Sequence, residues 1–345
     1  MKLNIHLKFL YLFIGIIFIS IMYSTKAISI DNVSKPPECT ESTTGVVTIS
    51  SGPATDCITQ PDQQKITFYQ FDFCKAEPTA PTLTSSLIKN RCSTFFKNEN
   101  GAEVTVEYQN GTAIGSESDY LGVPRGTYTH AIITMDPVFK FKNTVTFASA
   151  NINDADAGSN RAEDGETTCV TKISTPAIAW GMKDIDGSDA ENYAVGTVNC
   201  GDGLTAEEIS VGINTIGGTD ESGNCLTSGR FVGTNSDVDV FLIDSSGNLV
   251  NGTAGGTGCV DNGRGTISRI IGVMPISLKV NRKTSGFKVK YNNSNGVMLD
   301  FSSNDADSSA PFWLIGMDSA YFDMTIETVE NTTPGGVGCK TGDFC

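Results

Sequence analysis

Ten cysteines constrain this 345-residue chain most, because their number is even and all of them follow an apolar leader. The leader has a basic start, an apolar run from Phe9 to Tyr23 and a small-residue exit at 25–27. This order is typical of a signal peptide, and we expect residues 1–27 to be cleaved off; an uncleaved anchor is the alternative. Cysteines of an exported chain pair in an oxidising compartment. The sequence therefore predicts a disulfide-stapled protein that is secreted, periplasmic or at the cell surface.

Pairing each cysteine with its neighbour in the sequence closes short loops with little topological conflict in a fold rich in hairpins. The predicted pairs are Cys39–Cys57, Cys74–Cys92, Cys169–Cys200, Cys225–Cys259 and Cys339–Cys345. Other connectivities stay open from sequence alone. The chain has no Cys-x-x-Cys motif, and His130 is the only histidine after the leader. Tetrahedral zinc sites and thioredoxin-type redox chemistry therefore lack their ligands.

Short runs of alternating residues, rich in β-branched and aromatic side chains, recur along the chain and predict strands. The predicted strands are 66–73, 104–108, 128–135, 138–147, 168–173, 178–182, 194–198, 208–213, 238–244, 265–274, 276–280, 287–291, 297–301, 312–317 and 321–330. Turn pairs such as Asn110-Gly111 and Asn295-Gly296 separate them. Helix is expected only as single turns at 83–89 and 205–209. The pattern predicts an all-β fold.

The fold class that we expect is two antiparallel β-sandwich domains with very little helix, stapled by disulfides. One large β domain is the alternative for a chain of this length. After the signal peptide, the predicted parts are an extended N-terminal segment 28–64, a first sandwich 65–150, an acidic Gly/Asp/Asn linker 151–167, a second sandwich 168–331 and a flexible tail 332–345 with a Cys-closed loop. The extended segment holds a strand-like run, 46–49, that could pair with the open sheet edge of a neighbouring molecule.

The stretch from Leu121 to Thr129 contains a Leu, followed by Gly126 and Tyr128. It resembles the strand entry of prealbumin-like and other bacterial surface β-sandwich modules. The resemblance implies that Gly126 makes a turn and that Tyr128 packs at the start of a strand. It covers about 20 residues and implies a fold, not an activity.

The formal net charge of −15 argues against nucleic acid as a partner, because phosphate binding depends on clustered Lys and Arg. After signal cleavage no segment is apolar enough to insert in a membrane. A Ser-His-Asp mechanism would have to use His130, and no Gly-x-Ser-x-Gly elbow supports it. The 39 acidic residues offer many carboxylate pairs to a glycosidase and single out none. Catalytic residues are therefore not predicted.

Calcium is the ligand that the composition favours most, since hard cations bind several loop oxygens. The tetrapeptide 153–156 recurs at 304–307, and the candidate ligands are Asp154, Asp156, Asp305 and Asp307. Asp184, Asp186 and Asp189 form a further acidic group. No group fits the EF-hand register. The alternative is that these residues only form turns, where Asp is common.

These observations predict an exported, non-enzymatic protein with a structural or adhesive role, whose partners are other surface proteins or further copies of itself. The alternative is a carbohydrate-binding module or a glycan-active enzyme, with or without calcium. Sugar sites on sandwiches need exposed aromatic side chains. The candidates are Trp180, Trp313, Tyr120, Tyr193, Tyr291 and Tyr321. Both tryptophans are flanked by aliphatic residues, which favours the core for them.

Overall fold

The computed structural model describes residues 30–39, 46–47, 57–106, 112–147, 167–173, 195–199, 206, 208–213, 215–216, 224–233, 237–252, 267–291, 296–304, 312–319 and 324–330. The chain divides into two compact units, Met1–Ile30 and Asp31–Cys345. All described residues except Ile30 belong to the second unit. The predicted signal peptide lies outside the described residues.

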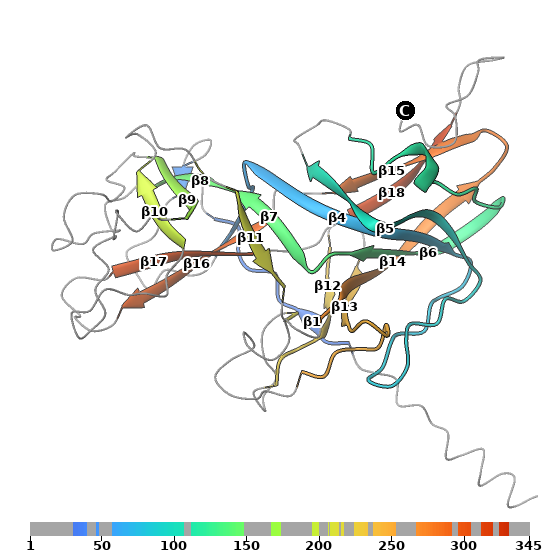
Figure 1. Cartoon of the computed structure of the whole chain (residues 1–345), viewed down its shortest axis with the longest axis horizontal. Coiled ribbons are helices and arrows are strands. Elements are labelled where there is room, and N and C mark those ends of the chain that lie inside the picture. The colour runs from blue at the N-terminus through green and yellow to red at the C-terminus, as the bar shows by residue number, and fades with distance from the viewer. Residues whose placement is uncertain are drawn as a thin grey trace, which may run out of the picture. The chain divides into compact units, whose positions relative to one another are not determined.

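Strands provide nearly all of the regular structure, which confirms the predicted all-β class (Figure 1). They are β1 Asn32–Val33, β2 Val46–Val47, β3 Cys57–Thr59, β4 Gln63–Cys74, β5 Cys92–Val106, β6 Gly126–Met135, β7 Val138–Lys142, β8 Thr144–Phe147, β9 Thr167–Ile173, β10 Val195–Asn199, β11 Ile209–Gly212, β12 Ser228–Phe231, β13 Val238–Ile243, β14 Arg269–Val280, β15 Thr284–Tyr291, β16 Val297–Asn304, β17 Phe312–Ser319 and β18 Met324–Glu330. Within the described ranges, helix occurs as one 3₁₀ turn, η1 Glu117–Asp119.

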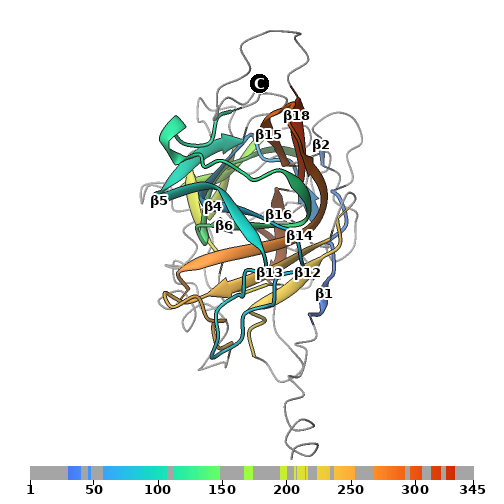
Figure 2. The ribbon, with the colours of Figure 1, turned by 90° about the vertical axis from the view of Figure 1, so that its right-hand side faces the viewer.

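Nine strands form the largest sheet, in the order β1-β12-β13-β14-β6-β4-β7-β11, with β5 paired to β4 beside this path. Figure 2 shows β5, β4, β6 and β14 as neighbours, with β13, β12 and β1 beyond them. Except for β1, which runs parallel to β12, the pairs in this sheet are antiparallel. Three smaller sheets have the orders β10-β9-β8-β2, β15-β18 and β17-β16-β3.

The large sheet combines strands from both sides of the predicted linker 151–167. β6 pairs with β14 and β7 pairs with β11, so hydrogen bonds join the stretches that were predicted as separate sandwiches. The apolar side chains of β14 explain why the two stretches join in one sheet. As an exposed edge strand β14 would be prone to aggregation, and in the structure it is paired with β13 on one side and with β6 on the other. The described strand pairs do not support two sequential sandwiches. The boundaries of the linker, the N-terminal segment and the tail stay predictions.

A bulge in β4 decides which of its aromatic side chains enter the core. Strict alternation would place Ile66 and Phe68 on one face of the strand and Phe71 and Phe73 on the other. The register with both neighbouring strands shifts between Phe68 and Gln70. An extra residue reverses the faces beyond it. All four apolar side chains therefore join one core, and Asp72 comes to lie on the opposite face.

The core under this sheet is rich in aromatic rings from distant parts of the chain. Phe73 of β4 stacks on Phe95 of β5, with ring centroids 5.5 Å apart. Phe287 of β15 contacts both rings, at 4.7 and 4.5 Å. Tyr128 of β6 is fully buried and lies 6.0 Å from Phe73. Such ring pairs add about 0.5–1.5 kcal/mol each to the burial of their area, so this cluster ties β4, β5, β6 and β15 together.

The N-terminal segment supplies one short edge strand to each of three sheets. β1 is at the end of the nine-stranded sheet, β2 is at the end of the sheet with β8, and β3 is at the end of the sheet with β16. The first two residues of the predicted run 46–49 form β2, which pairs in parallel with Thr146 and Phe147 of the same chain, and residues 48–49 lie outside the described residues. The described strands of the predicted N-terminal segment 28–64 are therefore parts of these sheets.

Candidate binding loop

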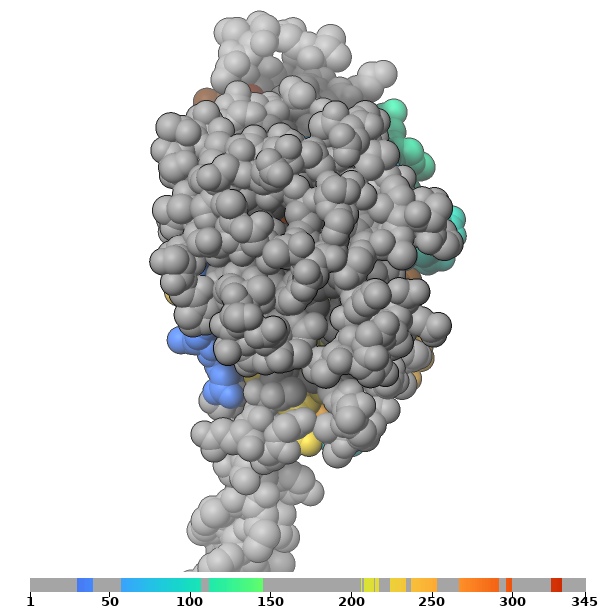
Figure 3. All heavy atoms as spheres, turned by 90° about the vertical axis from the view of Figure 1, so that its left-hand side faces the viewer, coloured from blue at the N-terminus to red at the C-terminus, as the bar shows by residue number. Residues whose placement is uncertain are grey.

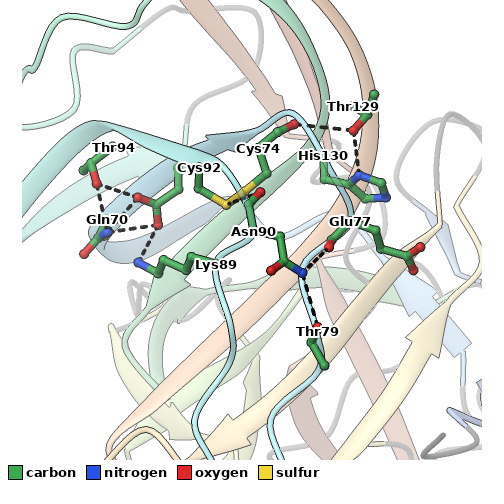
Figure 4. The surroundings of a disulfide bond; sticks show 11 residues. Gln70, Cys74, Glu77, Thr79, Lys89, Asn90, Cys92, Thr94, Thr129 and His130 are labelled. Carbon is green, nitrogen blue, oxygen red and sulfur yellow. Dashed lines mark hydrogen bonds and ion pairs between the residues drawn. A yellow bond between two sulfur atoms is a disulfide. The ribbon is translucent and has the colours of Figure 1, made fainter.

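The segment between β4 and β5, residues 75–91, is closed at its base by a disulfide and is called the binding loop below. Cys74 and Cys92 face each other in the strand register, and their sulfur atoms are bonded (Figure 4). At the same level the Lys75 amide donates a hydrogen bond to the Arg91 carbonyl, 3.2 Å away. The disulfide therefore ties together the two ends of the loop, where they join β4 and β5.

A buried carboxylate anchors the loop to the outer face of β4. The side chain of Asp72 is only 1% exposed. It accepts hydrogen bonds from Gln70 Nε2 at 2.8 Å and Thr94 Oγ1 at 2.6 Å, and it pairs with Lys89 Nζ at 2.7 Å. Figure 4 shows Gln70, Thr94 and Lys89 grouped beside the disulfide. Since a buried charge is tolerated only when paired and hydrogen-bonded, Asp72 holds Lys89, and with it the returning arm of the loop, against the strand.

Within the loop the chain folds back on itself as a small hairpin. Thr79 and Ile88 exchange two backbone hydrogen bonds of 3.0 Å, and the Thr82 amide donates to the Ser85 carbonyl at 2.8 Å. The predicted helical turn at 83–89 is therefore wrong. The cross-linked ends require the segment to return to its start, and paired arms do this more directly than a helix.

A second loop supports the tip of this hairpin. The Leu249 amide donates to the Thr82 carbonyl at 2.9 Å, and Ser86 forms a bridge with Asn248. Gly247, with φ of +81°, lies so close that a Cβ there would be 3.2 Å from the Ser86 Cβ. Together the disulfide, the Asp72 cluster and this support pre-organise the loop. Pre-organisation reduces the entropy that a binding surface loses when it meets a partner.

The hairpin exposes two large aliphatic side chains. Leu83 at the tip is 56% exposed and Ile88 on the returning arm is 54% exposed, the two highest values among the large apolar side chains that the structure describes. At the base of the loop the charge of Lys89 is paired with Asp72, and Lys75 and Arg91 are accompanied by one acidic loop residue, Glu77.

The predicted calcium ligands Asp154, Asp156, Asp305 and Asp307 lie outside the described residues, as do Asp184, Asp186 and Asp189. Within the described part of the chain, no group of three or more His, Cys, Asp or Glu side chains is placed to hold a metal ion. The calcium site stays a prediction.

One predicted sugar platform is wrong, because Tyr120 is buried rather than exposed. Its hydroxyl donates to the Ile114 carbonyl at 2.6 Å, and its ring contacts Phe95 and Phe96. Burial also raises the pKa of the Tyr120 phenol. Tyr291 is partly buried and accepts a hydrogen bond from Gln64. Trp180, Tyr193 and Tyr321 are outside the described residues, and only the backbone of Trp313 is described.

The structure gives the bonding state of five of the ten cysteines, which tests part of the predicted disulfide scheme. Cys39 is bonded to Cys57 and Cys74 to Cys92, which are the two pairs that the neighbour rule predicts there. Cys225 is disulfide-bonded as well. The partner of Cys225 lies outside the described pairs, and the pairs 169–200, 225–259 and 339–345 stay predictions. Within the described residues, no helix is long and apolar enough to cross a membrane.

The stretch that carries the family resemblance begins a strand as expected. Gly126 opens β6, and the hydroxyl of the fully buried Tyr128 donates a hydrogen bond to the Pro124 carbonyl. Desolvation in this position raises the pKa of the Tyr128 phenol. No family model, curated protein or solved structure matches the chain. The resemblance to prealbumin-like modules therefore stays a prediction.

The sequence between Cys74 and Cys92 indicates a closed loop, although periodicity predicted a helical turn there. Cys74 and Cys92 bracket a segment without apolar periodicity that contains Pro78 and Pro81. A pair of cysteines at the ends of two strands, with prolines between them, indicates a closed excursion rather than a helix. The exposure of Leu83 and Ile88 has no such signal, because it depends on how the loop lies on the protein surface.

Proposed function

We propose that the protein is an exported, non-enzymatic extracellular or cell-surface protein with a structural or adhesive role, and that the binding loop makes its main contact. The observation that carries this proposal is the loop itself: its ends are cross-linked and clamped, and it exposes Leu83 and Ile88. A monomer gains nothing in stability from apolar side chains held in water by a rigid frame, whereas a binding surface needs them. The disulfides are compatible with an oxidising compartment.

Fractionation of the producing cells tests the compartment. We expect the protein outside the cytoplasm, shortened by its leader, and with no thiol that reacts with an alkylating reagent before reduction. Native protein in the cytosol with free thiols would overturn export.

Binding of purified protein to the envelope fraction of the producing cells tests the adhesive role. Burial of one aliphatic side chain contributes about 1.5–3 kcal/mol, so replacing Leu83 and Ile88 together with Ser should weaken binding by at least about tenfold. The matched control is Val138→Ser, which removes an exposed apolar side chain on β7, outside the loop, and should leave binding unchanged. Equal effects of the loop variant and this control would argue against the loop as the contact.

A further inference from the structure

The nine-stranded sheet ends in an edge that only two residues cover. On this side the four-residue strand β12 is followed only by β1, which pairs with it in parallel as Asn32 with Arg230 and Val33 with Phe231. One further backbone hydrogen bond joins the Arg230 amide to the Asp31 carbonyl at 2.8 Å. Removing β1 would leave unpaired backbone groups along β12, and such an edge is a template for a strand of another chain.

A socket in β12 receives the side chain of β1. Gly229 has no side chain, and a Cβ built there would lie 2.6 Å from Val33 Cγ2 and 2.7 Å from Ile216 Cγ2. Val33 therefore occupies space that exists only because residue 229 is glycine. Val33 also packs against the buried core cluster. The edge thus offers both backbone pairing and a shaped apolar seat, the two components of strand-addition binding.

The socket is flanked by a fixed ion pair. Arg230 Nε and Nη2 donate to the two carboxylate oxygens of Asp239, at 2.6 and 3.0 Å. This pair raises the pKa of the Arg230 guanidinium. Both partners belong to β12 and β13, so this pair links the edge strand to its inner neighbour and does not involve β1.

The arm that carries β1 is attached to the rest of the chain through a short exposed hinge. Beyond it the chain is fixed: the Ile58 amide donates to the Pro37 carbonyl at 2.9 Å, and Cys39 is bonded to Cys57. Residues 34–36 lie between this anchor and Val33, and most of residues 30–39, blue in Figure 3, are at the surface. Pro36 and Pro37 restrict the hinge to extended conformations. A hinge with few accessible conformations reduces the entropy that the arm loses when it pairs with an edge.

We propose that β1 exchanges between copies of this chain, so that Asn32–Val33 of one copy pairs with β12 of a second copy. Exchange replaces each contact of the arm with the same contact in the neighbour, and its cost is the entropy of association. High local concentration, as on a surface, offsets this cost. The inference deepens the structural role under the proposed function, because it makes a second copy the partner.

Cross-linking between two differently tagged full-length chains tests the exchange. One chain carries Asn32→Cys and the other Arg230→Cys, two positions that face each other in the β1–β12 register. Both are purified with their native disulfides intact, mixed and treated with a short thiol cross-linker over a range of concentrations. We expect a cross-linked product that contains both tags and that increases with concentration. A yield above that of a cysteine pair outside the β1–β12 register requires the arm of one chain to lie at the edge of the other.

Three controls make the result decisive. Lys97→Cys replaces the edge cysteine with an exposed position on β5, and this pair should give no mixed product. Gly229→Val in the edge chain fills the socket and should reduce the mixed product by at least about tenfold. Val33→Asp in the arm chain should have the same effect, and it keeps the test valid if the Gly229 variant does not fold. A mixed product no greater than with Lys97→Cys at every concentration would overturn the exchange. Since the assay uses purified protein, this failure is distinct from a failure of export or of envelope binding.

Discussion

The centre and the rim of the nine-stranded sheet are held in different ways. At the centre, β4, β6 and β14 pair over long stretches, and Phe73 is in contact with aromatic rings from three other strands. At the rim, β1 contributes two residues, and one valine side chain fits over one glycine. The centre has many mutually supporting contacts, whereas the rim depends on a few that a second molecule can replace. Elements of low local stability are the ones available for exchange or binding.

Centre and rim should differ most in the free energy of unfolding that is lost when one apolar side chain is truncated in each. Phe73→Ala leaves a cavity among Phe95, Tyr128 and Phe287 and should lower the free energy of unfolding by about 3–5 kcal/mol. Val33→Ala removes a half-exposed contact and should lower it by about 1 kcal/mol or less. Urea unfolding followed by tryptophan fluorescence measures both. Similar losses for the two variants would mean that the rim is as firmly packed as the centre.

The two described disulfides sharpen the comparison because both have a sequence separation of 18. The chain-entropy model assigns both the same effect on the unfolded state, about 3 kcal/mol. Replacing Cys74 and Cys92 with Ala should show this full loss. Replacing Cys39 and Cys57 should cost less, because the freed N-terminal arm gains entropy in the native state. Chemical unfolding gives the two losses, and limited proteolysis should find faster cleavage at residues 34–36 in the second variant only.

The sequence predicted the centre better than the rim, for a physical reason. Strands such as 66–73 and 128–135 carry an apolar pattern that specifies them wherever they pair. β12 has the sequence Ser-Gly-Arg-Phe, which has no such pattern, and it becomes a strand because β13 offers it partners. β1 and β3 are likewise too short to show a period. The bulges in β4 and β14 also leave no periodic signal. The sequence predicted separate strands 265–274 and 276–280, whereas β14 continues through Pro275, which lies where the register with β6 shifts.

Only the disulfide that closes the binding loop could be predicted from the sequence. Its disulfide follows from the positions of Cys74 and Cys92, but Asp72 gave no sign that it would be buried. Its burial requires the bulge after Phe68, which turns it away from the core, and Lys89, which covers it. A site that depends on a change of face and on a loop from further along the chain cannot be read from local periodicity.

Removing the ion pair between Asp72 of β4 and Lys89 of the binding loop should have an intermediate effect on the free energy of unfolding. Asp72→Asn keeps the shape of the side chain, removes its charge and leaves Lys89 without its partner. The hydrogen bonds from Gln70 and Thr94 then meet an amide that presents one acceptor oxygen instead of two. We expect the free energy of unfolding to fall by about 1.5–3 kcal/mol, the range for hydrogen bonds to a charged group. Lys97→Met, which breaks an exposed pair with Glu99, is the control and should change stability by less than about 0.5 kcal/mol. If both substitutions had equal effects, the Asp72 cluster would not anchor the loop.

The smallest expected effect concerns η1, which leads from the end of β5 toward β6. Asp119 accepts hydrogen bonds from the Ser116 amide at 2.7 Å, the Ser116 hydroxyl at 2.9 Å and Asn98 at 3.1 Å. The hydrogen bond from the Ser116 amide is the main reason that the pKa of Asp119 is lowered. A carboxylate with a lowered pKa in the folded state stabilises the protein above its ordinary pKa and loses this contribution as the pH falls through the lowered value. Asp119→Asn should therefore cost about 1 kcal/mol or less at neutral pH, and the difference from wild type should shrink below about pH 4. Thermal unfolding from pH 3 to pH 7 measures this trend, and a difference that stayed constant over the range would show that the ionised carboxylate makes no contribution of its own.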